Sequence, residues 1–361
     1  MPTTPELIVS GYTREGYGAG PGMVRYALLA DGTVGQQLAQ GTAVTNPSFM
    51  AAGGAVLFVV EELEQGNVVA VDPWSLEVLG RVSSGGADSC HVALVDGAVW
   101  VANYSTGTAT VLPAEDVVGV SINAGSHGAP VQPIVLAHPG SGPVSDRQGE
   151  SHAHQVTATE WGTVLVADLG ADRVDEYSAE SHVRLGSAEL PPGTGPRHVA
   201  IKGEFLLVAG ELDGYLHVMR RTVRDAHGEY FWHWLFKVPL AENSQAIADA
   251  DQFFPSHIQL AEDGSKLYAA VRGPDTVVVL DVSGLNVPEN ADAAPTPPRL
   301  LQQLSSGGTW PRHFAVAHNK MYVANQNSNN VAVFEVDSQG LLGQEPLQSV
   351  EFGSPTCVLP R

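Results

Sequence analysis

Short apolar runs alternate along the whole chain with turns rich in Gly, Asn and Asp. Val, Leu, Phe and Tyr dominate the runs, and amphipathic stretches of helical length are scarce. Runs of this composition, bounded by such turns, are typical of strands joined in hairpins. The clearest runs cover residues 56–60, 99–102, 164–167, 205–209, 266–271 and 320–324. The pattern therefore predicts an all-β chain.

A short recurring sequence motif, which we call the phrase, precedes each of these runs, and most of its copies contain histidine. The copies occupy residues 46–49, 89–92, 152–155, 196–199, 255–258, 311–314 and 355–358. Aligned on the histidine, the copies place Phe49, His91, His154, His198, His257, His313 and Cys357 at the equivalent position. A β-rich repeat of roughly 50 residues is typical of a propeller, in which each repeat forms one blade.

Each unit has a second run after the first, for example at residues 67–71, 276–280 and 330–334, which predicts a four-stranded antiparallel blade. Six phrases are followed by a full unit, and the seventh by one strand only. The N-terminal runs at residues 7–11, 22–28 and 36–43 supply the missing strands. We therefore predict a seven-bladed β-propeller, a single domain over residues 1–361, closed by pairing N-terminal strands with the C-terminal strand.

Three segments are longer than the repeat requires. Residues 114–150, rich in Gly, Ser, Pro and Ala, predict an outer strand followed by an extended loop. Residues 215–255 contain an aromatic group, which we interpret as a packed insertion between blades because aromatic side chains mainly supply buried area. Residues 286–298 predict a surface loop. The aromatic group consists of Tyr230, Phe231, Trp232 and Trp234.

The chain is strongly acidic, with 18 Lys and Arg against 39 Asp and Glu, a net charge of −21. Such a surface repels phosphate backbones and anionic lipid, so nucleic acid and membrane partners are not expected. The two cysteines, Cys90 and Cys357, lie in phrases that are not neighbours, and no disulfide is predicted. With no secretory signal or membrane-spanning run in the sequence, we expect a cytoplasmic protein. No particular oligomeric state is predicted.

The phrases point to one end of the central channel. The phrase begins the innermost strand, and the next strand is antiparallel, so its end returns to the same rim. A histidine in the phrase is also consistent with simple packing. Three guanidiniums near one axis, from Arg197, Arg272 and Arg312, instead favour an anionic ligand. The second strands end at Glu61 or Glu62, Asn103, Asp168, Glu211, Arg272 and Asn325.

Several chemistries are conceivable for this ring of side chains. His152 and His154 are alternate residues of a strand and could face one metal ion, but no carboxylate set accompanies them and their spacing matches no standard metal site. We therefore predict no metal. The sequence has no Gly-x-Ser-x-Gly nucleophile motif and no glycine-rich phosphate loop. General acid–base chemistry by His and Glu, with arginines stabilising an anion, is the remaining prediction.

Several motifs together resemble one known family. They are Arg147-Gln148, Ser151-His152-Ala153-His154, Gly195-Pro196-Arg197-His198, Glu211-Leu212, Arg272-Gly273, Pro311-Arg312-His313-Phe314 and Ala324-Asn325-Gln326. The chain resembles the seven-bladed propeller lactonases, which include propeller-type 6-phosphogluconolactonases and carboxy-cis,cis-muconate lactonising enzymes. The resemblance implies a catalytic set of His154, Arg197, Glu211 and Arg272, without metal or cofactor. The substrate-binding candidates are His91, His152, His198, His257, Arg312, His313, Asn103, Asn325 and Arg147.

Three functions remain open from the sequence. The first is hydrolysis of a small anionic lactone, most simply 6-phosphogluconolactone, with His154 or Glu211 as the base. The second is the related cycloisomerisation, in which a carboxylate of a carboxymuconate adds to a carbon–carbon double bond and forms a lactone on the same residues. The third is a non-enzymatic propeller that serves as a binding scaffold, because a fold alone does not establish chemistry.

Overall fold

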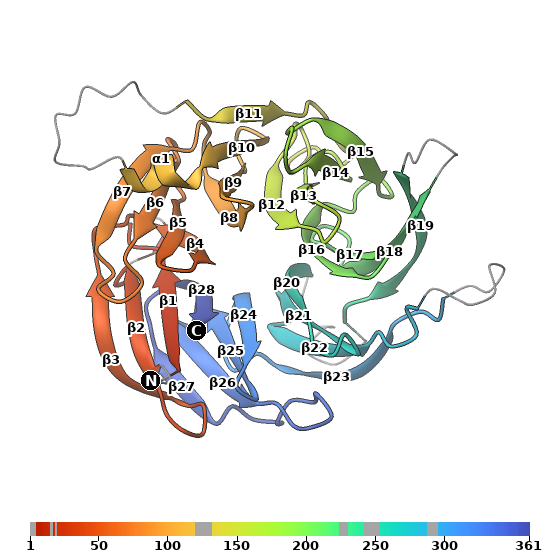
Figure 1. The fold of residues 1–361 in the computed structure, drawn as a ribbon. Helices are drawn as coiled ribbons and strands as arrows, with labels where there is room; N and C mark the ends of the chain where they lie inside the picture. The colour runs from red at the N-terminus through yellow and green to blue at the C-terminus, as the bar shows by residue number, and fades with distance from the viewer. Residues whose placement is uncertain are drawn as a thin grey trace.

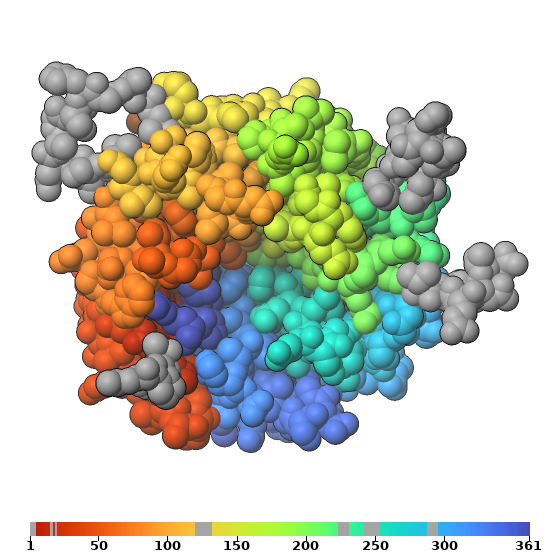
Figure 2. All heavy atoms as spheres, in the orientation of Figure 1, coloured from red at the N-terminus to blue at the C-terminus, as the bar shows by residue number. Residues whose placement is uncertain are grey.

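A computed structural model describes residues 5–361 except 15–16, 19, 120–131, 224–229, 242–252 and 287–294. The strands form seven four-stranded antiparallel sheets arranged as blades around one axis (Figure 1). On the face drawn in Figure 2 the centre of the ring is hollowed. The predicted seven-bladed propeller is therefore confirmed.

The blades are numbered along the chain from the first complete repeat, and each runs from its innermost to its outermost strand. Blade 1 contains β4 (Pro47–Gly53), β5 (Val56–Glu61), β6 (Asn67–Val71) and β7 (Val78–Ser83). Blade 2 contains β8 (Ser89–Val95), β9 (Ala98–Asn103), β10 (Thr108–Pro113) and β11 (Ile134–Ala137). Blade 3 contains β12 (Ala153–Ala158), β13 (Thr163–Asp168), β14 (Arg173–Ser178) and β15 (Arg184–Glu189).

The remaining blades follow the same order. Blade 4 contains β16 (Pro196–Lys202), β17 (Phe205–Gly210), β18 (Tyr215–Val223) and β19 (Tyr230–Pro239). Blade 5 contains β20 (Phe254–Leu260), β21 (Lys266–Arg272), β22 (Thr276–Asp281) and β23 (Arg299–Ser305). Blade 6 contains β24 (Pro311–Ala317), β25 (Lys320–Asn325), β26 (Asn330–Glu335) and β27 (Gln348–Glu351).

Blade 7 joins the two ends of the chain. Its order is β28 (Pro355–Pro360), β1 (Glu6–Gly11), β2 (Met23–Leu28) and β3 (Val34–Gly41), so a C-terminal strand lies innermost in a sheet of N-terminal strands. The register runs from Leu7 opposite Pro360 to Ser10 opposite Cys357. This pairing leaves no gap between the first and last repeats, as the sequence predicted.

Burial between blades holds the ring together. The second strands are almost wholly apolar, and all six residues of β17 are buried. In the described part of the chain the buried apolar side chains form seven clusters, each between two adjacent blades. One such cluster packs Leu207 and Val218 of blade 4 against Ala269 and Val278 of blade 5. Each blade therefore depends on both neighbours, which is typical of a repeat protein.

Two local expectations need correction. The aromatic segment is not an insertion but β19, the regular outer strand of blade 4, in which Trp232 packs against Trp161 of blade 3 with ring centroids 6.1 Å apart. Trp234 of the same strand is exposed. A short helix, α1 (Ala114–Gly119), precedes the expected outer strand β11. The loop predicted at residues 286–298 falls largely outside the described residues.

Both cysteines are buried and neither forms a disulfide, in agreement with the prediction. Among the described residues no helix is long and apolar enough to cross a bilayer.

Candidate active site

Each innermost strand carries an irregularity at the recurring phrase. The pairing register shifts within the phrase in all seven blades, for example between Pro311 and His313. A bulge of this kind interrupts the strict alternation of side chains and re-aims them. Two adjacent residues of one strand, Arg197 and His198, therefore both contact side chains in the channel.

The residue just before the histidine position of the phrase commonly forms a hydrogen bond to the next blade. The hydroxyls of Ser48, Ser256 and Thr356 donate to backbone carbonyls of the next blade, at Ser89, Pro311 and Pro47. Blades 4 and 6 have arginine at this position instead. Arg197 keeps the bridging bond, since its Nη1 donates to the carbonyl of Ser256, and its longer side chain also reaches a carboxylate.

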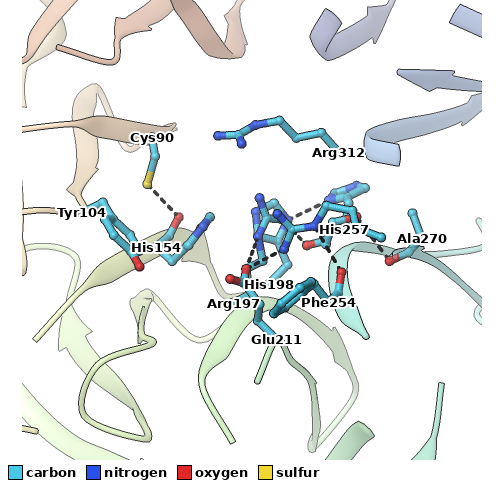
Figure 3. Close-up of polar contacts among 12 residues, drawn as sticks. Cys90, Tyr104, His154, Arg197, His198, Glu211, Phe254, His257, Ala270 and Arg312 are labelled. Carbon is cyan, nitrogen blue, oxygen red and sulfur yellow. Dashed lines mark hydrogen bonds and ion pairs between the residues drawn. The ribbon is translucent and has the colours of Figure 1, made fainter. Parts of the chain in front are cut away.

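Glu211 lies at the centre of a cluster of three arginines. Its Oε2 lies 2.9 Å from Arg197 Nε in an ion pair and accepts from Arg272 Nη2 at 2.7 Å, and its Oε1 accepts from Arg147 Nη2 at 2.5 Å. These residues come from blade 4, blade 5 and the loop between β11 and β12. Figure 3 shows Arg197, Glu211 and His198 grouped together in the channel. We call this set, Arg147, Arg197, Glu211 and Arg272, the Glu211 cluster.

The charges of the Glu211 cluster do not cancel. Burial alone would raise the pKa of the Glu211 carboxyl, but Arg272 and Arg197 outweigh that effect and hold the pKa well below its usual range. Burial and the neighbouring Arg272 lower the pKa of Arg197 to about 9, which still leaves its guanidinium charged at neutral pH. Three guanidiniums facing one carboxylate leave two excess positive charges, which favour an anionic ligand.

His154 lies beside the cluster as a neutral imidazole. Its side chain is only 7% exposed, and burial together with the charge of Arg197 lowers its pKa well below the usual range. Its Nδ1 is buried without a hydrogen-bond partner. The ring lies edge-on to Tyr104, with centroids 5.6 Å apart. A neutral imidazole with an unused nitrogen can accept a proton.

Four further histidines and a phenylalanine form a layer of rings inside the channel. The Nδ1 atoms of His198 and His257 are 2.8 Å apart, and the rings of His257 and His313 are 4.2 Å apart. His91 stacks on Phe49 with centroids at 3.9 Å. Burial is the main cause that lowers the pKa of every one of these imidazoles. We call His91, His198, His257, His313 and Phe49 the ring layer.

Arg312 reaches the channel from another side, apart from the Glu211 cluster (Figure 3). Its Nη2 lies 3.3 Å from Glu62 Oε2, and its guanidinium carbon lies 5.1 Å from the ring centre of Tyr12. Since Glu62 balances its charge, this pair contributes no excess charge. Of the two glutamates considered at the end of β5, Glu62 therefore lies here, while Glu61 binds Arg81 and Asn67 within its own blade.

The structure places Asn103 and Asn325, which were predicted to bind substrate, within the hydrogen-bond networks of their own blades and turns. Both side chains are wholly buried. Asn103 accepts from Ser89 Oγ at 2.8 Å and donates to Thr108 of the third strand, and Asn325 donates to the carbonyl of Ser306 at 3.0 Å. These amides tie a strand end to its own blade and adjoining turn.

Spacing explains which strand-end residues reach the channel. Glu211 follows His198 by thirteen residues, and Arg272 follows His257 by fifteen, whereas Asn103 and Asn325 follow their histidines by twelve. Neighbouring residues of a strand point to opposite sides, so an even and an odd spacing select opposite faces. The residue that the sequence analysis missed is Tyr104, thirteen residues after His91, and the same odd spacing would have found it.

The structure does not assemble a metal site from the His-x-His motif. His152 stacks on Tyr104 with centroids at 4.5 Å, and its Nδ1 lies 3.0 Å from the backbone oxygen of Tyr104. Asp168 accepts backbone N–H bonds from His152, Gly170 and Ala171. Outside the gaps given above, no group of three or more His, Cys, Asp or Glu could hold a metal ion.

The fold is a closed propeller, and one end of its channel carries excess positive charge beside a layer of imidazoles. These two features together indicate a propeller that binds or converts a small anionic ligand. A family model described as "Lactonase, 7-bladed beta-propeller" matches residues 6–360, almost the whole chain. The chain therefore belongs to the seven-bladed propeller lactonase family.

Individual relatives agree with this membership. A protein named 6-phosphogluconolactonase from Bacillus subtilis is 29% identical over 333 residues, which cover 87% of this chain and 86% of the relative. The solved structure of a periplasmic gluconolactonase from Pseudomonas aeruginosa superimposes with a TM-score of 0.81 at 27% identity, covering 99% of this chain and 98% of the other. A structure from Lactobacillus plantarum gives a TM-score of 0.80 at 25% identity, covering 99% of this chain and all of the other.

Proposed function

We propose that this enzyme hydrolyses a sugar lactone with an acidic group, such as 6-phosphogluconolactone, at the Glu211 cluster. The observation that carries the proposal is the excess positive charge of three guanidiniums on one carboxylate beside a neutral imidazole. The names of relatives, a 6-phosphogluconolactonase and a gluconolactonase, support a sugar lactone as the substrate class.

Arg197 and Arg272 stabilise the oxyanion that forms when water attacks the lactone carbonyl. Each binds Glu211 through one nitrogen and a backbone carbonyl through another, so both guanidiniums are fixed before substrate arrives. Arg197 Nη2 and Arg272 Nη1 take no part in these bonds and can donate to the substrate. Fixed donors aimed at developing charge are the main source of rate enhancement in acyl transfer.

His154 acts as the general base and Glu211 does not. Both oxygens of Glu211 are paired with guanidiniums, whose charge holds its pKa well below the usual range, so neither oxygen is free to take a proton from water. His154 is neutral and has an unpartnered Nδ1 beside the cluster. In this mechanism His154 takes the proton from water, and the protonated imidazole then returns it to the leaving ring oxygen.

Substitution of the cluster tests the proposal. Arg197→Ala should lower kcat/KM for 6-phosphogluconolactone at least about 100-fold, because loss of one oxyanion contact typically costs 10²–10³ in rate. Glu211→Gln should lower it to a similar extent, because it weakens the ionic contacts that hold Arg197 and Arg272 in position. The rate must be measured at several enzyme concentrations and corrected for spontaneous hydrolysis. Near-normal rates in both variants would remove the assignment.

A matched control separates charge from chemistry. Glu204→Gln also removes one carboxylate that faces an arginine, Arg220 at 3.2 Å, but this pair lies at the opposite end of β17 from Glu211. Its kcat/KM should remain within about twofold of the wild type, since exposed ion pairs contribute little. Thermal unfolding of all three variants shows whether any loss of rate comes from unfolding.

A cytoplasmic location is part of the same proposal. Two buried, unbonded cysteines are consistent with a reducing compartment, where disulfides are rare. Cell fractionation with antibody detection tests it, and recovery in a periplasmic fraction, the location named for the Pseudomonas aeruginosa relative, would contradict it.

A further inference from the structure

We propose that a hollow next to Arg147 is the subsite for a negatively charged arm of the lactone, and that Arg147 selects that charge. This inference rests on the proposed function and assigns the part of the substrate that does not react. The subsite has a volume of about 320 Å³. Its lining is Val144, Asp146, Arg147, Leu212, Asp213, Phe253 and Phe254.

The hollow adjoins the Glu211 cluster through Arg147 and Phe254. Arg147 lines it and also binds Glu211 at 2.5 Å. Phe254 lines it too, its ring lies 5.9 Å from the guanidinium carbon of Arg272, and its carbonyl accepts from Arg272 Nε at 3.1 Å. A substrate whose carbonyl is held by Arg197 and Arg272 therefore has room for its remaining arm in this hollow.

Arg147 differs from the other two arginines of the cluster in what it leaves free. Its side chain is 33% exposed, against 3% for Arg197 and 7% for Arg272. In the described structure only its Nη2 is bonded, to Glu211 and, at 3.5 Å, to the hydroxyl of Tyr104. The Nη1 and Nε donors remain for a ligand, and a guanidinium fork binds phosphate or carboxylate oxygens in pairs.

The loop holds Arg147 in place. The next residue, Gln148, is wholly buried and donates to the carbonyl of Leu169 at 2.9 Å and to Asp172 at 2.7 Å. The carbonyl oxygen of Val144, earlier in the same loop, accepts the backbone N–H of both Arg147 and Gln148. Because the backbone is fixed on both sides, Arg147 is presented to the hollow before a ligand binds, which reduces the entropy lost on binding.

Charge balance favours an anion rather than a neutral arm. The Glu211 cluster carries two excess positive charges; the oxyanion of the reaction balances one, and a fixed anion on the arm balances the other. Two acids also line the hollow. Asp213 is already paired with Lys237 at 3.1 Å and His217 at 2.9 Å, and Asp146 is exposed at the rim, where solvent screens its charge.

The test compares lactones that differ in charge. Glucono-1,5-lactone is neutral, its 6-phosphate carries a phosphate, and glucaro-1,4-lactone carries a carboxylate. Arg147→Gln should lower kcat/KM roughly 10- to 100-fold for the anionic lactones, mainly through KM, as expected for loss of hydrogen bonds to a charged group. The value for the neutral lactone should change less than about threefold. The lactone with the larger loss identifies the anion that the subsite prefers.

Two controls complete the experiment. Arg220→Gln removes an equal charge far from the channel and should leave the ratio between anionic and neutral lactones unchanged. Arg147→Lys keeps the charge without the fork and should retain part of the preference, which also covers the case in which the Gln variant does not fold.

The outcomes separate the two proposals. Equal losses for neutral and anionic lactones in Arg147→Gln, or a wild type that does not prefer an anionic lactone, would overturn the subsite. A wild type that hydrolyses no lactone at all would overturn the proposed function itself.

Discussion

One carboxylate organises the chemistry of single residues in this site. Glu211 orients three arginines from separate parts of the chain, and those arginines suppress its own basicity. In the proposed mechanism the proton-accepting role therefore belongs to His154, whose Nδ1 has no partner. A strained residue supports the arrangement: Trp310 has φ 65°, unusual for a bulky side chain, and its ring centre lies 5.2 Å from the guanidinium carbon of Arg272.

The pH dependence of the rate tests the role of His154. A base must be neutral to accept a proton, and burial together with Arg197 lowers the pKa of His154 below its usual 6.5. We expect kcat/KM to stay constant as the pH falls from 7.5 to about 6.5, and to decline with unit slope only at lower pH. A decline centred above pH 7, after correction for spontaneous hydrolysis, would exclude His154 as the base.

At the scale of elements, the innermost strands have two functions. The bulge in β16 lets two adjacent side chains, Arg197 and His198, contact groups in the channel. In several of these strands the side chain before the histidine position also ties the strand to the next blade. Thr356 of β28 shows this at the junction of the chain ends, since its hydroxyl contacts the carbonyl of Pro47 at 3.0 Å and that of Ser10 at 3.2 Å. Arg197 combines the same bridge with a place in the Glu211 cluster.

Thr356→Val should destabilise the fold by about 1–3 kcal/mol, because the substitution removes the donor and leaves a buried carbonyl oxygen of β4 without its bond. Denaturant unfolding measures the change. Thr356→Ser keeps the hydroxyl and is the matched variant, and it should retain most of the stability. Equal losses in the two variants would mean that the methyl group, and not the hydrogen bond, stabilises this junction.

At the scale of the whole molecule, the ring layer makes the free energy of unfolding depend on pH. His91, His198, His257 and His313 come from four different blades and meet only in the closed ring. In the unfolded chain each binds a proton with ordinary affinity, near pH 6.5. In the folded chain burial lowers every pKa, that of His313 to about 3.

The free energy of unfolding should therefore fall as the pH drops below about 6.5, because the unfolded state then binds protons that the folded state excludes. The loss approaches about 1 kcal/mol per pH unit for each imidazole and continues toward pH 3 for His313. Denaturant unfolding at pH 7, 6 and 5 measures it. His313→Gln should reduce the slope, because it removes one of the imidazoles whose pKa burial lowers. A stability that does not change between pH 7 and 5 would contradict this account.

The blade architecture could be predicted because each repeat carries its own strand and turn signals. Arg197, Glu211 and Arg272 could be placed together because they lie at repeated positions of the phrase and the strand end. Asn103 and Asn325 were misplaced because a one-residue difference reverses the side a strand residue faces, and the bulge hides the correct count. The three ion pairs of Glu211, on which its proposed role depends, rely on side-chain positions in space that no spacing along the chain specifies.

The pairing of β28 with β1 has a consequence for biosynthesis. About 340 residues separate the two strands, and a ribosome adds roughly 5–20 residues per second, so β1 emerges roughly 20–70 s before its partner. During that interval the apolar edge around Leu7, Ile8 and Val9 has no inner neighbour. Nascent chains should therefore require chaperone protection at β1, and synonymous codons that slow translation between β1 and β28 should lower the yield of folded enzyme.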